Sequence, residues 1–423
     1  MTAGSEAGGV RAGLRAAAEA GGDALVELTR RLVACDTQTP PSDTGAICAL
    51  VRGLLADVPG VQFEAYTQQA PVENLVATLR GGRPGPRLVL NGHLDTYPIG
   101  PLDRWRTDPL GGQVRDGRLY GRGSCDMKGG IAACMLVLRL FAQQVRDFPG
   151  ELVLVLAGDE ESMGELGTQA LIDHVPACRA DAAIVADVGS PRVIRCGEKG
   201  MVWLALDASG KSSHGAHVHR GANAIEALMQ ALSALKTLES LRIDPGHEAV
   251  AAMARAQPVS EPLGGDGERD VMSRVTVNIG TFHGGQSPNL VPDAARAEVD
   301  IRLPLGVSTA RVEAEIARLL QPLPQVRCTV TRRYEATWTP PAHALVRAAC
   351  GAAAEVLRQP VVPNMRVGAS DARLWRRAGV PTVVCGLTPY NLGAADENLD
   401  VAELPQLAAL IGLAAYDFLH GTT

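Results

Sequence analysis

Short apolar runs alternate with helical patterns along the first part of the chain. Residues 87–91, 151–157 and 182–186 are mostly apolar, which is typical of strands in a sheet that is covered on both faces. Residues 25–32 and 47–55 instead repeat apolar side chains at helical spacing. This alternation predicts an α/β fold with a mixed, largely parallel sheet and helices on both faces.

The same pattern continues beyond these runs and returns near the end of the chain. Residues 130–141 are apolar on nearly every side, as in a helix packed against a sheet, and residues 381–386 predict a further buried strand. A last helix is expected over about 404–419. Because both chain ends carry elements of this kind, we assign 1–196 and 337–423 to one domain.

Residues 197–336 show a different order of elements. The pattern predicts strand, helix, strand, strand, helix and strand at 201–208, 222–241, 275–282, 295–303, 309–320 and 326–332. That βαββαβ order describes an inserted, ferredoxin-like α+β domain with two helices on one face of a small sheet. The polar, Gly- and Pro-rich stretch at 244–270 is expected to be a surface insertion.

Composition excludes several classes of protein. With 423 residues the chain exceeds what one hydrophobic core serves, which agrees with two domains. A net charge of −6 without a basic stripe gives no support for nucleic-acid binding. No apolar run approaches the roughly 18–20 residues of a membrane span, and the N-terminus has no apolar signal region. Nine cysteines without a CxxC pair suit reduced thiols, so we expect a cytoplasmic protein.

Candidate metal ligands follow three of the predicted strands. His93 and Asp95 come after the first strand, Glu160 and Glu161 after the second, and Asp187 after the third. Because the carboxyl ends of parallel strands meet at one edge of a sheet, these side chains are expected to lie close together. One imidazole and several carboxylates suit Zn²⁺, Mn²⁺ or Co²⁺. The sequence therefore predicts a divalent metal site at this edge.

The spacing of these residues suggests further roles. In an extended segment the side chains of His93 and Asp95 point the same way, so Asp95 can accept the second imidazole N–H and orient a metal-bound His93. Glu160 and Glu161 are adjacent on a turn, so one can bind metal while the other serves as general base. The base would act on water whose pKa the metal lowers to about 7. The alternative is a pair of surface glutamates without such roles.

Two neighbouring residues have competing interpretations. Asp126 starts a predicted helix after a Gly-rich turn, so taken alone it is as well explained as a helix N-cap as it is as a ligand. Beside the other candidate ligands, we interpret it as a ligand. Cys125 precedes it, and a nucleophilic role there would need a nearby base and an orienting group, so we treat that role as the minor alternative.

Seven stretches of the chain, in order, resemble one known family. They are NGHLDTYP (91–98), GRGSCDMKGG (121–130), GDEESMGELGT (158–168), GKSSHGAHVHRGANAI (210–225), GGQSPNLVPDAARAEVDIRLP (284–304), GASDAR (368–373) and ADEN (395–398). Similar motifs belong to the co-catalytic zinc aminoacylase/carboxypeptidase family, which includes acetylornithine deacetylase, succinyl-diaminopimelate desuccinylase and glutamate carboxypeptidase. The resemblance implies a zinc-peptidase-like catalytic domain at 1–196 and 337–423. The inserted domain at 197–336 would be a lid and dimerisation domain.

The resemblance also implies roles for the candidate ligands. His93 and Asp187 would be terminal ligands of one metal, and Asp126 would bridge two metals. Glu161 would bind the second metal. Asp95 would be the orienting acid and Glu160 the general base.

Further residues would contact substrate, according to the same resemblance. His214, in the lid, would polarise the scissile carbonyl, a role usually supplied by the partner subunit of a dimer. Asn289 and Arg302 would contact substrate from the lid, and Arg373 would bind an anion. His217 and His219 could suggest another metal site, although a loop is the favoured interpretation.

The chain departs from the family at one ligand position. Family members commonly carry a His shortly before an acidic pair, and Gly393 stands there, before Asp396 and Glu397. Glycine offers no side-chain ligand, so the second metal would keep only Asp126 and Glu161. We therefore expect one tightly held divalent metal and a weakened or absent second site.

The leading hypothesis is a metal-dependent hydrolase that cleaves a C–N amide bond of a small acylated amino acid or related carboxylate with metal-activated water. One alternative is a hydrolytic deaminase of an activated aromatic amine on the same fold, motivated by the missing ligand. A second alternative is a non-catalytic metal- or ligand-binding homologue, which the retention of Glu160 beside Glu161 disfavours. We expect a small-molecule substrate bearing a carboxylate, no nucleic-acid or membrane partner, and a homodimer or higher oligomer formed through the lid.

Overall fold

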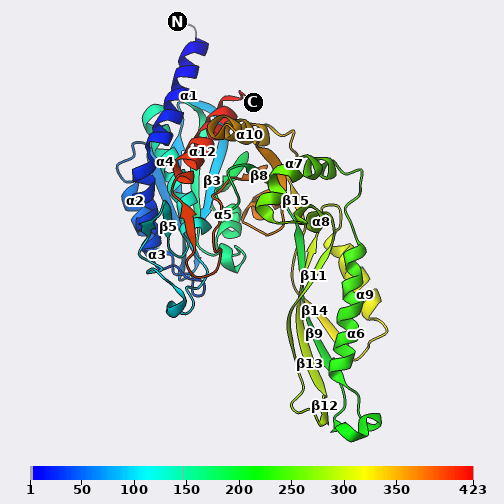
Figure 1. Cartoon of the computed structure of the whole chain (residues 1–423). Helices are drawn as coiled ribbons and strands as arrows, with labels where there is room; N and C mark the ends of the chain where they lie inside the picture. Colours follow the sequence, from blue (N-terminus) through cyan, green and yellow to red (C-terminus); the bar gives the residue numbers. More distant parts are fainter. Residues whose placement is uncertain (1–2, 146, 423) are drawn as a thin grey trace. The chain divides into compact units, whose positions relative to one another are not determined.

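In a computed structural model that describes residues 3–145 and 147–422, the chain divides into two compact units (Figure 1). The larger unit contains the chain up to Cys196 together with Thr339–Asn364 and Ser370–Thr423. The smaller unit contains Gly197–Trp338 and the short segment Met365–Ala369. The sequence placed the second limit at 336/337 and gave no sign of the short segment. Each unit has its own hydrophobic core.

A mixed sheet forms the centre of the larger unit. Its strands are β1 (Val61–Gln69), β2 (Val72–Arg80), β3 (Arg83–His93), β6 (Pro149–Ala157), β7 (Ala182–Val185), β8 (Val193–Glu198) and β17 (Thr382–Val384). Their order is β1-β2-β6-β3-β7-β17-β8, and β8 also pairs with β15 (Thr337–Trp338) and β16 (Val362–Arg366). The central pairs β6-β3, β3-β7 and β7-β17 are parallel, whereas β1-β2, β2-β6 and β17-β8 are antiparallel. The predicted mixed α/β fold is confirmed.

Helices cover both faces of this sheet. The α-helices described in this unit are α1 (Ala3–Ala20), α2 (Gly22–Val33), α3 (Gly45–Leu54), α4 (Gly129–Gln144), α5 (Thr168–His174), α10 (Ala344–Leu357), α11 (Ala372–Arg377) and α12 (Glu403–His420). Val89 of β3 packs in one core with Trp375 of α11, whose indole N–H donates to Asn91 at 3.2 Å. Gly92 faces the other way, toward Ile131 of α4. Figure 1 shows α4 and α12 side by side on that second face, where both contact β3.

A second, smaller sheet in the larger unit has three strands. They are β4 (Gln113–Arg115), β5 (Arg118–Tyr120) and β18 (Asn398–Asp400), in the order β18-β5-β4. β18 joins β5 antiparallel, with Asn398 opposite Tyr120. The sheet thus brings the chain segment before α4 next to the segment before α12.

The smaller unit follows the predicted βαββαβ order. Its elements are β9 (Gly200–Ser209), α6 (Ala224–Lys236), β11 (Thr276–Gly284), β13 (Ala294–Leu303), α9 (Thr309–Leu320) and β14 (Val326–Tyr334). The four strands pair antiparallel in the order β11-β13-β9-β14. Figure 1 shows α6 and α9 together along one side of this sheet. Leu228 of α6 and Ile316 of α9 pack in one core with Leu204 of β9 and Ile301 of β13. The ferredoxin-like prediction is confirmed.

The expected surface insertion is largely helical. It contains α7 (Glu248–Gly264) and α8 (Glu268–Ser273), and Pro258 and Pro262 lie inside α7. Each proline removes a backbone N–H from the helix, which is why the sequence gave no helical signal there. Met253 and Met272 are buried in a small core with Ile243, and this packing stabilises the helices despite the prolines.

Among the helices of residues 3–145 and 147–422, none combines the length and the apolar character that a membrane crossing requires.

Candidate metal centre

Three potential metal ligands meet at the carboxyl edge of the large sheet. His93 is the last residue of β3, Asp126 lies in an irregular turn before α4, and Glu161 lies in the turn Glu160–Ser162 after β6. β3 and β6 are parallel neighbours with His93 opposite Ala157, so the segments after them emerge together. One ligand atom from each of His93, Asp126 and Glu161 lies within 4.8 Å of the other two. The predicted convergence of these three residues is therefore observed.

The local backbone decides between the two interpretations of Asp126. α4 begins at Gly129 with Lys128 as its N-cap, and Asp126 has non-helical angles (φ −117°, ψ 89°). The N-cap interpretation is therefore wrong. Gly130 shows how closely α4 approaches the sheet, because an added Cβ there would lie 2.1 Å from the carbonyl oxygen of Ala186. This close approach fixes where the turn that carries Asp126 stands.

Residue 95 orients His93, but chiefly through its backbone. The Nδ1 atom of His93 is 2.9 Å from the carbonyl oxygen of Asp95 and 3.6 Å from its carboxylate. The Nε2 atom lies 3.0 Å from the Asp126 carboxylate. The Asp95 carboxylate instead accepts the backbone N–H groups of Glu160 and Glu161 at 3.0 and 3.1 Å. Asp95 thus holds both the histidine and the two glutamates in place.

The donor set fits a divalent cation. The Oε1 atom of Glu161 is buried and has no hydrogen-bond partner among the described residues. Burial and then the charge of Asp126 raise the pKa of Glu161 to about 10. Burial also raises the pKa of Glu160 well above its ordinary value. A metal ion bound by one imidazole and the carboxylate oxygens of Asp126 and Glu161 would supply the positive charge that compensates this crowding.

Glu160 faces a different set of neighbours. Its carboxylate is 3.8 Å from the guanidinium of Arg373, which donates to the carbonyl oxygens of Ser370 and Met163 at 2.6 and 2.8 Å. The charge of Asp187 is among the causes that raise the pKa of Glu160. Arg373, predicted to bind an anion, is therefore beside the predicted base.

Asp187 is buried after β7, as expected, and accepts the N–H of Val188 at 2.5 Å. Among the described residues, however, it is outside the group formed by His93, Asp126 and Glu161. Its role as a ligand remains a prediction.

A buried ion pair between Arg122 and Glu397, which we did not predict, holds the backbone at Asp126 in place. Glu397 is 1% exposed, and its carboxylate accepts from Arg122 Nη1 at 2.6 Å. The same carboxylate accepts the backbone N–H groups of Cys125 and Asp126, both at 3.3 Å. The acidic pair at 396–397 was the sequence signal for this position, but the pair gave no indication of its distant partners. Glu397 is a positioning residue for the turn that carries Asp126.

Tyr97 occupies the space beside the missing histidine. The charge of Glu161, followed by burial, raises the pKa of Tyr97 to about 12. An added Cβ on Gly393 would lie 3.8 Å from the Tyr97 ring. The sequence did not single out Tyr97, because nothing along the chain connects it with residue 393.

The predicted substrate contacts of the inserted domain belong to the smaller unit. His214 is exposed on β10 (Ser213–His214), which pairs with β12 (Leu290–Val291). Asn289 is therefore next to His214, and its carbonyl oxygen accepts the N–H of Gly215 at 2.7 Å. Arg302 is on a different strand, β13, and donates to Asp300 at 2.9 Å. The structure thus brings two of the three residues together.

Two alternative sites gain no support. The rings of His217 and His219 are 5.9 Å apart and His214 lies 6.0 Å from His217, but among the described residues their ligand atoms do not form a group of metal-binding size. Cys125 is buried, and burial raises the pKa of its thiol well above the ordinary value. A thiol in that state is a poor nucleophile, because the thiolate is the reactive form.

Known proteins share both the sequence and the fold. The sequence profile of peptidase family M20/M25/M40 matches residues 89–417. A succinyl-diaminopimelate desuccinylase of Cereibacter sphaeroides is 31% identical over 401 residues, covering 91% of this chain and 96% of that protein.

Two solved structures share the fold. An M20 family metallo-carboxypeptidase of Sulfolobus solfataricus has a TM-score of 0.76 and 17% identity, with 92% of this chain and 99% of that one covered. A dinuclear metal-binding peptidase of the M20 family from Bacillus subtilis has a TM-score of 0.69 and 15% identity, with 95% and 99% covered.

Proposed function

Because the chain belongs to peptidase family M20/M25/M40, we propose that it hydrolyses the amide bond of a small acylated amino acid bearing a carboxylate. The family predicted from the motifs is confirmed, and with it a metal-dependent hydrolase that acts on C–N bonds. The observation that carries the finer proposal is Glu160, a carboxylate with only 13% of its side chain exposed, which lies beside the group of potential ligands but is not part of it. Similarity to a desuccinylase supports an acylated amino acid as the substrate.

The candidate site residues around the metal centre each have a proposed role in this reaction. A divalent ion held by His93, Asp126 and Glu161, with Asp187 as a further proposed ligand, would supply Lewis-acid chemistry and lower the pKa of water. Glu160 would accept a proton from the attacking water and return it to the leaving nitrogen. Asp95 fixes the backbone of Glu160 and orients His93.

Four further residues have proposed roles in substrate binding. Arg373 lies beside Glu160 and is the proposed partner of the substrate carboxylate. From the smaller unit, Asn289 and Arg302 would contact the substrate, and His214 would stabilise the oxyanion that develops on the scissile carbonyl. His214 and Asn289 are neighbours, which supports a joint role.

The activity is tested on a panel of substrates with metal-loaded and chelator-treated protein. We expect release of the free amino acid from N-succinyl or other N-acyl amino acids, lost on chelation and restored by Zn²⁺, Mn²⁺ or Co²⁺. Aromatic amines are included as comparison substrates. Turnover of aromatic amines alone, or no turnover of any acylated amino acid by fully loaded protein, would contradict the proposal.

We further propose that one metal per chain is held tightly and that the second position is weak. Gly393 offers no side-chain ligand, and the ring of Tyr97 lies beside it. Loss of a ligand should weaken metal binding at least as much as loss of a ligand's partner, which costs about 10–100-fold. Elemental analysis of dialysed protein should therefore give one equivalent.

A single substitution tests this explanation of the metal count. Gly393→His places an imidazole where an added Cβ has 3.8 Å of room, in a left-handed conformation (φ +69°) that His tolerates better than most residues. We expect retained metal to rise toward two equivalents. Gly379→His is the matched control, because Gly379 is also left-handed (φ +82°) and has open space around it. Two equivalents in the unsubstituted protein would show that another residue replaces the missing ligand.

A further inference from the structure

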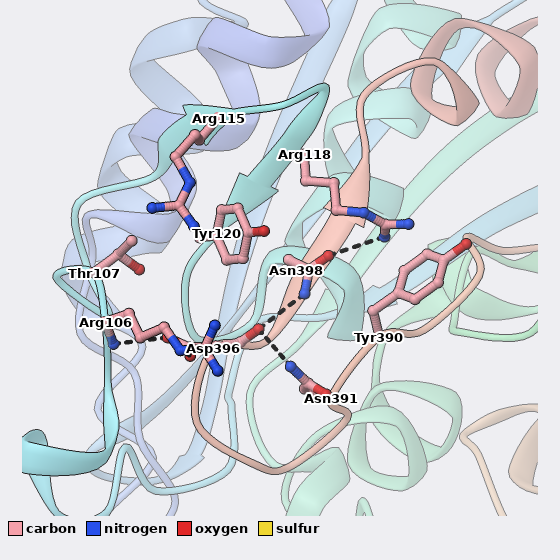
Figure 2. A pocket seen from close by; sticks show the side chains of 9 residues that line it. All are labelled: Arg106, Thr107, Arg115, Arg118, Tyr120, Tyr390, Asn391, Asp396 and Asn398. Carbon is pink, nitrogen blue, oxygen red and sulfur yellow. Dashed lines mark hydrogen bonds and ion pairs between the residues drawn. The ribbon is translucent and has the colours of Figure 1, made fainter.

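A cavity of about 220 Å³ lies on the small three-stranded sheet of the larger unit (Figure 2). Three arginines reach it from different segments: Arg106 from the loop before β4, Arg115 from β4 and Arg118 from β5. Only one carboxylate, that of Asp396, is among the residues that line it. The walls therefore carry two more positive charges than negative ones.

The arginines are only partly neutralised by the protein. Arg106 pairs with Asp396 at 3.3 Å, and Arg115 pairs with its own neighbour Asp116 at 3.5 Å. Arg118 forms no ion pair with any residue in the described part of the chain, although the more distant charge of Glu403 acts on it. Guanidinium donors in this cavity are therefore left for another acceptor.

A second arginine-rich cavity of the same unit shows the contrast. There Arg80 and Arg87 pair with Glu151 at 3.2 and 2.5 Å, and Arg83 pairs with Asp147 at 3.6 Å. Arg179 also lines that cavity and forms no ion pair with the described residues, so an unpaired arginine alone does not define a site. The cavity on the small sheet differs because its unpaired arginine, Arg118, is held by an aromatic ring and an amide.

Arg118 is held in position without being neutralised. Its guanidinium lies 3.8 Å from the centre of the Tyr390 ring, and its Nη1 atom donates to the side chain of Asn398 at 3.1 Å. Asn398 is 5% exposed and donates in turn to the carbonyl oxygen of Asp396 at 2.9 Å. An arginine fixed by a ring and an amide loses little conformational freedom when it binds a ligand.

We propose that this cavity binds a compact dianion through Arg118 and Arg115, the shared chemistry being that of a phosphate group or a short dicarboxylate. Guanidinium groups match the paired oxygens of both ligands. The positive excess and the volume of about 220 Å³ favour a small dianion over a long or highly charged one. The proposal does not depend on the hydrolase reaction.

The cavity shares a chain segment with the metal centre. Residues 390–398 close on themselves through the bridge between Tyr390 and Asn398, which both line the cavity. The same segment carries Glu397, whose carboxylate accepts the backbone N–H of Asp126. A dianion bound at Arg118 would therefore restrict the segment that positions one metal ligand.

Calorimetric titration of the full-length, metal-loaded protein tests the proposal. Inorganic phosphate and succinate are titrated separately, at an ionic strength held constant with chloride. The variants are Arg118→Met and the more exposed Arg115→Gln, which is expected to fold even if the first is not. Arg83→Met is the matched control, because Arg83 is in the same unit and, like Arg115, pairs with an exposed aspartate, but it lies outside this cavity.

We expect saturable binding of at least one of the two dianions, with a Kd that rises tenfold or more in Arg118→Met and Arg115→Gln. A loss of that size follows from removing one charged hydrogen bond. Phosphate alone would assign a phosphate-bearing ligand, and succinate alone a dicarboxylate. Binding that both variants leave unchanged would place the anion at the metal and overturn the proposal. An equal loss in Arg83→Met would show a general charge effect and would overturn it as well.

Discussion

Two adjacent glutamates have different surroundings. Glu161 contributes an oxygen to the group with His93 and Asp126, whereas Glu160 faces Arg373 at 3.8 Å. Both receive the same backbone support, because their N–H groups donate to one carboxylate, that of Asp95. The direction of each side chain, and not the backbone, therefore separates a proposed ligand from a proposed base.

Substitution of each glutamate separates these roles. Glu160→Gln should retain the metal and lose about 100-fold or more in turnover, because the amide cannot accept the proton. Glu161→Gln should lose metal. Glu165→Gln, at an exposed glutamate of the same loop, is the control and should change neither property. Equal metal loss in Glu160→Gln and Glu161→Gln would reject the assignment of the base.

Tyr97 gives a second prediction at the level of a residue. Tyr97→Phe removes the hydroxyl whose pKa the charge of Glu161 raises, but keeps the ring beside Gly393. Partners of metal ligands typically contribute about 10–100-fold to metal affinity, so we expect roughly tenfold weaker binding in competition with a chelator. Tyr66→Phe, where the ring stacks on His174, is the control. Unchanged affinity in Tyr97→Phe would show that the hydroxyl does not position Glu161.

At the level of elements, the packing of α4 decides where the turn with Asp126 lies. α4 is buried almost all round, and Gly130 lets it approach the backbone that leads from β7 to Asp187. A helix at this distance from the sheet needs a residue without a side chain at the contact. Gly130 therefore helps to position Asp126 by allowing α4 to pack closely against the sheet.

Two glycine-to-alanine substitutions test this argument. Gly130→Ala places a Cβ 2.1 Å from the oxygen of Ala186, and overpacking of this kind costs about 1–3 kcal/mol. Gly351→Ala, in α10 with no neighbour within 4 Å, should instead stabilise by about 0.4–1 kcal/mol, because it restricts the unfolded chain. Urea unfolding measures both changes. A stability of Gly130→Ala equal to that of the unsubstituted protein would mean that α4 shifts freely.

The junction between β8 and β9 holds a buried lysine with a predicted pH dependence. Lys199 donates to the carbonyl oxygens of Val271 and Arg274 at 2.6 and 2.8 Å. Burial, followed by the charge of Arg274, lowers the pKa of Lys199 to about 7. Between this value and the ordinary 10.5 the unfolded chain binds a proton that the folded chain does not, so stability rises with pH across that window.

Substitution of Lys199 should remove the part of the pH-dependent rise in stability that this lysine causes. The unfolding free energy of the unsubstituted protein minus that of Lys199→Met should increase by up to about 1.4 kcal/mol per pH unit above pH 7. Lys236→Met, at a half-exposed lysine of the same unit, controls for the loss of a surface lysine. A difference that stays constant from pH 7 to 9.5 would contradict the lowered pKa.

At the level of the whole molecule, we expect a dimer formed through the smaller unit. Its edge strand β11 carries Ile279 and Phe282, which are 39% and 38% exposed, and Leu290 of β12 is 36% exposed. α6 and α9 cover one face of the sheet, and an open edge with apolar side chains is suited to pairing with a second copy.

Sedimentation and mixing experiments examine this prediction. Ile279→Glu should convert a dimer to a monomer, because it places a charge in the proposed interface. Mixing His214→Ala with Glu160→Gln should restore part of the activity if the histidine acts across subunits, since some mixed dimers then hold one complete site. Full activity in a protein that sediments as a monomer would exclude action across subunits.

The sequence by itself determined the elements and the edge of the sheet at which the site forms. The apolar runs at 151–157 and 182–186 became β6 and β7, because a strand that is buried on both faces tolerates few polar residues. The βαββαβ order of the inserted domain could likewise be predicted from the apolar pattern within each segment. His93, Asp126 and Glu161 could be identified because each follows a strand or a Gly-rich turn. Such a pattern is visible within a single local segment of the sequence.

The tertiary structure decided what depends on residues far apart in the chain. The contact of Glu397 with Asp126, and the place of Tyr97 beside Gly393, join segments that no periodicity connects. α7 forms despite its two prolines because Met253 packs into a core that the sequence does not reveal. Local sequence sets the preferences of each segment, whereas contact between segments is fixed only when burial and hydrogen bonding select one arrangement of the whole chain.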